Sequence, residues 1–289
     1  TNLTAANTYT GETVVNGDGA LNLNGVGAIA SAVVTISGNG ALTTDGDGIA
    51  DTAAVSVAGA NGILRVNGAE TIGSLTQTGG FVNGTSTLTT TSFAQTGGTT
   101  SGTVTVSTGT FSQNGGTIGT GTTVTQSGGA TMSGGSVAGV LTGAGTVTVQ
   151  TGTTTVTGTI ASTNVTVASG ELSLDSGEGL TTATDLTVNG GLVDVNIDEA
   201  IATLNGSGGT VDVDAANTLT LGEATLDTAT YAGNVTGAGD LIKLGTNTQV
   251  FSGVNGLTGT VDVNAGTLRI TGTIAATDLE TAAAGTLET

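Results

Sequence analysis

A short motif recurs at a fixed interval in the first half of the chain. The segments 75–80 (LTQTGG), 93–98 (FAQTGG) and 111–116 (FSQNGG) are equally spaced, and 124–129 (VTQSGG) follows after a shorter interval. The regular interval of about 18 residues is typical of one coil of a parallel β-helix, in which equivalent residues stack about 4.8 Å apart. Gln77, Gln95 and Gln113 are therefore predicted to form a ladder of amides that fixes the register of the coils. A binding stripe along these glutamines is the alternative.

Short alternating segments support the same fold elsewhere in the chain. A period of two places the aliphatic residues on a buried face and the polar residues outside. Clusters of Gly, Asn and Asp, such as 16–19 and 114–116, accept the positive φ angles of tight corners. The alternating segments are 104–106, 147–149, 165–167, 172–174, 211–213, 219–221, 261–263 and 268–270.

These patterns predict an all-β chain without helices. No apolar pattern of helical period is long enough for a helix, and the absence of Pro suits strands that are paired on both sides. We expect residues 1–289 to form one continuous β-solenoid of roughly 14 coils, each of about 18–22 residues, and to be a fragment of a longer protein.

Composition argues against a compact globular domain. The chain has 289 residues, 52 of them Gly, with 36% hydrophobic, 9% charged and only 2% aromatic residues. A globular domain carries about a quarter charged residues. The abundance of Val and Thr favours strands over disorder, so we expect a narrow core of small aliphatic layers.

The charge distribution excludes two classes of partner. The net charge of −19 arises from 22 acidic and 3 basic residues, whereas binding to nucleic acid requires Lys and Arg at the phosphates. The longest apolar stretch, 26–34, is far shorter than the roughly 20 residues of a membrane span. We therefore expect no nucleic-acid binding and no direct membrane insertion. Residues 71–170 carry no charge at all, and a ligand would be sought first along this neutral middle.

Two segments near the ends of the chain resemble each other. Residues 3–25 read LTAANTYTGETVVNGDGALNLNG, and residues 251–272 read FSGVNGLTGTVDVNAGTLRITG, the latter preceded by GAGDLIKLG at 237–245. Together they resemble the autotransporter-associated β-strand repeat. Residues 50–75 are similar to a second element of that family, and 143–145 resembles its Gly-small-Gly start, whereas the Gln-Gly-Gly coils depart from it.

The resemblance implies the passenger domain of a Gram-negative autotransporter, a type V secretion protein. Such a passenger is exported unfolded and folds outside the cell as a right-handed parallel β-helix, often acting in adhesion, in aggregation or as a stalk. It also implies an extracellular or cell-surface location, with an outer-membrane anchor, a C-terminal β-barrel, in a region outside these residues.

Catalysis is not expected. The chain has no His, no Cys and a single Lys, Lys243, so the usual base beside a Ser or Cys nucleophile is missing. A paired-carboxylate glycosidase needs only two acids, but two Tyr and no Trp offer few platforms for a sugar. We assign no catalytic residue, no cofactor-binding residue and no cofactor.

Two sets of aspartates raise the question of calcium. Asp45, Asp47 and Asp51 match the third, fifth and ninth positions of an EF-hand loop, but the first and twelfth positions lack the expected acids. A simple Asp-Gly turn is the favoured interpretation. Asp194 and Asp212 are the central residues of two Val-Asp-Val segments, separated by the same interval as the glutamine motifs. They are expected to face outward on adjacent coils and to repel by roughly 1 kcal/mol. We assign no metal ligand, and weak stabilisation by calcium is a hypothesis.

The leading hypothesis is a structural or adhesive rod that contacts other cells, surfaces or copies of itself. The main alternative is a building block of an extracellular filament, in which exposed strand edges pair head to tail. Carbohydrate-binding and ice-binding solenoids are minor alternatives. Ice binding requires a regular array of outward Thr, and no obvious Thr-x-Thr register from coil to coil is visible in the sequence.

Overall fold

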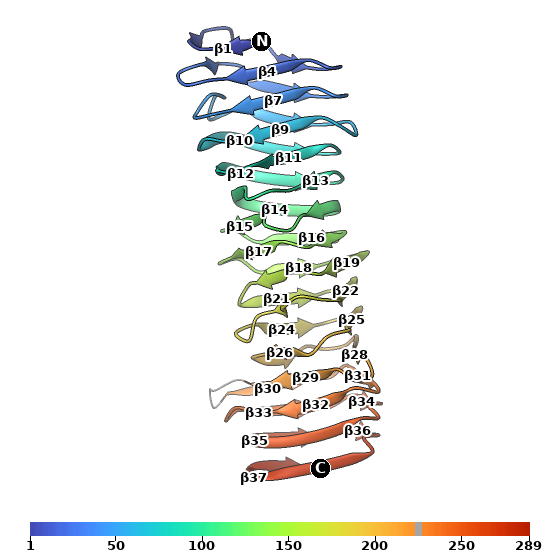
Figure 1. Cartoon of the computed structure of the whole chain (residues 1–289). Helices are drawn as coiled ribbons and strands as arrows, with labels where there is room; N and C mark the ends of the chain where they lie inside the picture. The colour runs from blue at the N-terminus through green and yellow to red at the C-terminus, as the bar shows by residue number, and fades with distance from the viewer. Residues whose placement is uncertain (223–226) are drawn as a thin grey trace. The chain divides into compact units, whose positions relative to one another are not determined.

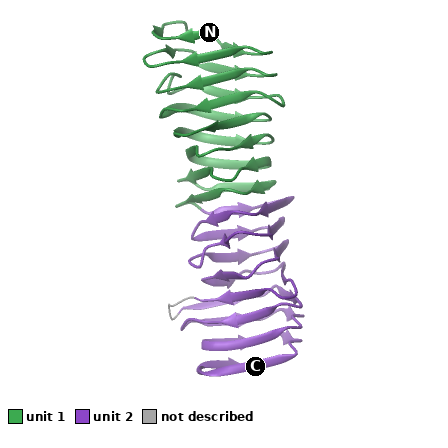
Figure 2. Cartoon of the chain, in the orientation of Figure 1, with its two compact units in different colours: residues 1–145 green, residues 146–289 purple. Residues whose placement is uncertain are grey.

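The computed structural model describes residues 1–222 and 227–289, and its regular elements are β-strands (Figure 1). The strands pair in parallel and stack as a β-solenoid of about 15 turns, without a helix in the described residues. The predicted all-β parallel solenoid is confirmed. Within the same residues, no helix is long and apolar enough to cross a membrane. The chain forms two compact units, residues 1–145 and 146–289 (Figure 2).

The strands of the first unit follow one another at short intervals. They are β1 Asn2–Leu3, β2 Ala6–Asn7, β3 Thr13–Val15, β4 Ala20–Leu23, β5 Ala28–Ile29, β6 Val33–Ile36, β7 Ala41–Thr44, β8 Ala54–Val57, β9 Ile63–Val66, β10 Glu70–Gln77, β11 Phe81–Gly84, β12 Thr87–Gln95, β13 Thr99–Thr100, β14 Thr105–Ile118, β15 Thr123–Gln126, β16 Ala130–Val137 and β17 Val140–Gly143.

The second unit has the same character. Its strands are β18 Val147–Val149, β19 Thr153–Val156, β20 Thr159–Ala161, β21 Asn164–Val167, β22 Glu171–Leu174, β23 Gly179–Leu180, β24 Asp185–Val188, β25 Leu192–Val195, β26 Glu199–Ile201, β27 Thr203–Asn205, β28 Thr210–Val213, β29 Thr218–Leu221, β30 Thr228–Tyr231, β31 Asn234–Gly237, β32 Asp240–Lys243, β33 Thr248–Phe251, β34 Val254–Asn255, β35 Thr260–Ile270, β36 Thr273–Ile274 and β37 Asp278–Glu288.

Most coils have the expected length, but the length of some coils falls outside the predicted range. Leu75 lies opposite Phe93, its equivalent in the next motif, as the repeat interval requires. The coil is slightly shorter where Gln126 lies opposite Gly143, and it is several residues longer where Thr210 lies opposite Asn234. The strand pairs keep their register across these changes, so a coil can change its length while the ladders persist.

The core of each unit is built from the inward positions of the alternating segments. In β8, Val55 and Val57 are buried, and in β28 Val211 and Val213 are buried while Asp212 between them faces outward. The largest packed pair of the first unit is Phe93 on β12 and Phe111 on β14, whose ring centroids lie 5.1 Å apart. Alternation thus sorts aliphatic and aromatic side chains into one narrow core, as predicted.

The predicted glutamine ladder is confirmed, and it lies inside the solenoid. Gln77, Gln95 and Gln113 are paired in register on β10, β12 and β14, and all three are fully buried. Gln95 Nε2 donates to Gln77 Oε1 at 3.1 Å, and Gln113 Nε2 donates to Gln95 Oε1 at 2.9 Å. Buried amides are not accessible as a binding stripe. The fourth motif does not extend the ladder. On the next coil Met132 lies opposite Gln113, and Gln126 lies opposite Thr108 instead.

Breaking the ladder at its centre should destabilise the chain. The change Gln95→Leu keeps an apolar side chain in the core but removes the amide that both neighbours contact. Each buried polar group that loses a partner costs about 1–3 kcal/mol. We expect the urea midpoint to fall accordingly, whereas Gln150→Leu, at an exposed position, should leave it nearly unchanged. Equal midpoints for the two variants would contradict the role assigned to the ladder.

One buried cation closes a corner of the second unit. Lys243, at the end of β32, is fully buried, and its Nζ donates to the backbone carbonyls of Leu244 and Gly245. Burial lowers the pKa of the Lys243 ammonium to about 8. The single lysine therefore satisfies carbonyl groups at a turn and offers no charge to the surface.

Candidate functional site

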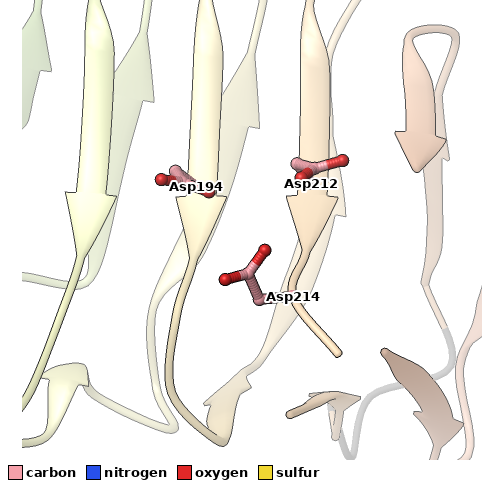
Figure 3. Close-up of side chains that lie close together, drawn as sticks. All are labelled: Asp194, Asp212 and Asp214. Carbon is pink, nitrogen blue, oxygen red and sulfur yellow. The ribbon is translucent and has the colours of Figure 1, made fainter. Parts of the chain in front are cut away.

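Three aspartates gather on the outer face of the second unit (Figure 3). Asp194 on β25 lies directly opposite Asp212 on β28, as the spacing predicted. Asp214 follows directly after β28, and one carboxylate oxygen from each of the three aspartates lies within 4.8 Å of the others. Asp214 was not predicted to belong to this cluster, although Asp214 follows Asp212 by two residues and therefore points to the same outer face.

The neighbours of this cluster supply hydrogen bonds but no positive charge. Asn196 Nδ2 donates to Asp194 Oδ2 at 3.0 Å, and the Thr236 hydroxyl donates to Asp212. The three basic side chains of the chain are engaged elsewhere: Lys243 is buried, Arg65 donates to Asn83, and Arg269 pairs with Glu288. Each close carboxylate pair repels by roughly 1 kcal/mol even in water. Carboxylate oxygens are the ligands that calcium prefers, so a bound cation would remove this repulsion.

We expect calcium to stabilise the chain through this cluster. Millimolar calcium should raise the melting temperature by a few degrees relative to excess chelator, since about 1 kcal/mol shifts a domain of this size by about 2–4 °C. The change Asp212→Asn should abolish the calcium effect. Asp278→Asn, which alters an exposed acid elsewhere, is the matched control and should preserve it. Identical melting in calcium and chelator would refute the hypothesis.

The other candidate loop is not assembled for calcium. Asp45, Asp47 and Asp51 are exposed, and they do not form a group of converging carboxylates within the described residues. Instead, the amides of Gly48 and Ile49 both donate to the carboxylate of Glu70 on the following coil. The segment is thus a turn between strands, which is the interpretation that the sequence favoured.

A polar groove crosses several coils of the second unit. It has a volume of about 400 Å³. Thr203 Oγ1 donates to Asp185 Oδ1 at 2.6 Å, and Asn205 Nδ2 donates to Thr203 Oγ1 at 2.9 Å. Carboxylates, amides and hydroxyls suit a ligand rich in hydroxyl groups, but no aromatic ring is among the described residues that line the groove. These residues are Asn164, Asp185, Thr187, Thr203, Asn205, Asp227, Thr228 and Ala229.

A regular hydroxyl lattice lies on the outer face of the first unit. Thr87 lies opposite Thr105, which lies opposite Thr123. Two residues further along the same strands, Thr89, Ser107 and Thr125 form a second column. The columns repeat about every 4.8 Å from coil to coil and about 6.6 Å along each strand. The Thr-x-Thr register that was not obvious in the sequence is present in β12 and β15, and β14 between them carries Thr105 and Ser107 at the same positions. The sequence did contain a signal for these columns, because their residues are separated by the same interval as the glutamines of the ladder.

Comparison with known proteins supports the family resemblance of the two end segments. The sequence model of the passenger-associated-transport-repeat family matches residues 1–23 and 241–270. These are the segments in which the sequence resembles the autotransporter repeat. Together with the parallel β-solenoid, they fit an autotransporter passenger domain with β-strand repeats. This repeat family implies a secreted or surface location. No curated protein and no solved structure matches the chain.

Proposed function

We propose that this passenger domain is a non-enzymatic structural and adhesive element at the surface of a Gram-negative cell, where it contacts other cells, surfaces or further copies of itself. The observation that carries the proposal is the pair of passenger-repeat matches at the two ends of a solenoid. An outer-membrane anchor in another part of the parent protein is included in the proposal.

The physical character of the coils supports a structural role. Many inner strands pair on both sides, as β12 does with β10 and β14, so that the backbone hydrogen bonds of one coil hold the next. The net charge of −19 opposes indiscriminate association. Residues 71–170 lack charge and present hydroxyls and amides instead, which makes this part of the chain the better surface for contact. A chain without His or Cys, whose one Lys is buried, has little means of catalysis.

Two measurements on cells of the source organism test the surface location and the adhesive role. Antibodies raised against residues 1–289 should label intact cells of the source organism as strongly as permeabilised cells. Beads coated with the purified chain should adhere to such cells more than beads coated with albumin. Labelling only after permeabilisation would overturn the surface assignment, and equal bead adhesion would overturn the adhesive role. Electron microscopy separates the alternative, since fibres in place of single projections would favour a filament.

The hydroxyl lattice favours a second candidate function, the binding of ice. Two columns of hydroxyls at fixed spacing can hold water molecules in a repeating array, because each hydroxyl both donates and accepts. Thermal hysteresis of the purified chain tests the idea. We expect Thr105→Lys, at the centre of the lattice, to abolish it and Ser112→Lys, at an exposed position outside the lattice, to retain it. An absence of hysteresis in the unaltered chain would exclude this function.

The polar groove is the place to look for the carbohydrate-binding alternative. Specific capture of one class of saccharide on a glycan array, lost in Asp185→Asn, would favour it over the structural role.

A further inference from the structure

Glu70 is a buried acid that joins two successive coils of the first unit. It begins β10 in phase with the core residue Ile72, and its side chain is only 2% exposed. Its two carboxyl oxygens accept hydrogen bonds from the amides of Gly48 and Ile49, both at 3.1 Å. These amides belong to the turn of the preceding coil. A single side chain therefore clamps that turn onto the next coil.

Glu199 makes a related clamp in the second unit, with one hydrogen bond to the preceding coil instead of two. It begins β26 in phase with the buried Ile201 and is 3% exposed. Its Oε2 accepts the amide of Leu180 at 3.0 Å, and its Oε1 accepts the amide of Ala200 at 3.0 Å. Gly179 has a φ of 65°, and a Cβ there would collide with Glu199 Oε2. The backbone at the start of β23 thus leaves room for the carboxyl group.

The charged groups that face the two clamps are all acidic. Asp47 lies beside Glu70 and interacts with it. Glu178 acts on Glu199 in the same way, and Asp198 lines the same shallow pocket as Glu199. A buried carboxylate without a cation is costly, so such a group prefers to keep its proton. Burial and the acidic neighbours therefore favour the neutral form of both side chains in the folded chain, whereas the amide hydrogen bonds favour the ionised form.

The pKa values of the two groups agree with this geometry. Burial raises the pKa of the Glu70 carboxyl to about 7 against the opposing bonds from Gly48 and Ile49, and Asp47 adds to the increase. Burial likewise raises the pKa of the Glu199 carboxyl to about 7 against the bonds from Leu180 and Ala200, with Glu178 adding to the increase. Both groups start from an ordinary pKa of 4.5.

We propose that Glu70 and Glu199 are proton-controlled clamps, which hold the turn at 47–49 and the short strand β23 while protonated and loosen them when the proton is lost. The neutral carboxyl fits the buried position, and in Glu70 its O–H can donate to Asp47. The ionised carboxylate gains hydration only by leaving that position, which breaks the bonds from Gly48 and Ile49 to Glu70 and the bond from Leu180 to Glu199. The solenoid is thereby tightened in mildly acidic surroundings and loosened at two defined corners in alkaline ones.

The direction of the pH effect follows from linkage. Because the folded chain holds these protons more tightly than the unfolded chain, unfolding releases protons at pH values between 4.5 and about 7. The stabilising contribution is complete below pH 4.5 and is lost as the pH rises through 7. The melting temperature should therefore fall by several degrees between pH 5 and pH 8.

A carboxyl titration tests the proposal on the unaltered chain. With ¹³C-labelled Glu side chains, NMR between pH 4 and pH 9 should show two carboxyl resonances with midpoints near 7. The amides of Gly48, Ile49 and Leu180 should exchange faster above that pH, beyond the ordinary acceleration by hydroxide. Midpoints of both buried carboxyls below 5 would overturn the proposal, whether or not any variant folds.

Matched variants provide the second readout. The double change Glu70→Gln and Glu199→Gln keeps a carbonyl acceptor in each turn but removes both titrations. It should flatten the melting temperature between pH 5 and pH 8. Glu280→Gln, at an exposed position on β37, removes the same charge without touching a turn and should keep the unaltered profile. A double variant that retains the full pH dependence would also overturn the proposal.

Discussion

Replacing Gly84 by Ala should destabilise the first unit strongly, although the change adds only one methyl group. Gly84, at the end of β11, pairs with Val66 on the preceding coil and has a φ of 140°. A Cβ at this position would collide with the carbonyl oxygen of Val66, and backbone cannot move aside as a side chain can. Strain of this kind costs about 1–3 kcal/mol, and overpacking adds about 1–3 kcal/mol. Chemical denaturation should therefore show a loss of about 2–6 kcal/mol.

The matched control separates the collision from the backbone angle. Gly25 also has a positive φ, of 63°, but a Cβ there would meet no atom within 4 Å. Gly25→Ala should therefore show only the conformational penalty of about 1–2 kcal/mol. If the two variants lost the same stability, close coil-to-coil contact at Gly84 would not be the cause.

The change Phe111→Ala is expected to have the other large effect. Phe111 is 2% exposed and packs against Phe93, and these two rings are the largest buried side chains in the core of the first unit. Removing a buried Phe side chain costs about 3–5 kcal/mol, because the transfer energy is lost and the surroundings fill the cavity only partly. A fall of this size in the free energy of unfolding, measured by denaturation, is the expected result.

The chain offers the same substitution at a surface position. Phe81 on β11 is 38% exposed, so Phe81→Ala removes an equal side chain with much less burial. Its cost should be well under half that of Phe111→Ala. A comparable loss at both positions would mean that the buried aromatic pair contributes nothing beyond local strand preference.

Much of the fold follows from two periodicities in the sequence. The regular interval of the glutamine motif placed Gln77, Gln95 and Gln113 in one column, and alternation placed Asp194 and Asp212 on the outer face; both predictions are confirmed. The fourth glutamine motif leaves the column because it follows the third after a shorter interval. Gln126 lies one regular coil interval after Thr108 and is therefore opposite that residue.

The buried ionisable residues show where the rules of composition mislead. Charged side chains are rarely buried, so Glu70, Glu199 and Lys243 were not expected in the core. Alternation does contain the signal, because each of the three lies two residues from a buried aliphatic residue on its own strand. The backbone amides of Gly48 and Leu180, which donate to Glu70 and Glu199, belong to the preceding coil, and only the folded chain brings them together.

The uneven length of the coils has a consequence for how such chains can change. Since each strand contacts only the coils before and after it, stability within each unit is close to a sum of nearest-neighbour terms. A coil that is several residues longer than its neighbour, as the one between Thr210 and Asn234 is, leaves the neighbouring ladders intact. Insertions at corners are therefore cheap in folding energy. The corners are where such a protein can acquire new specificity while its ladders stay the same.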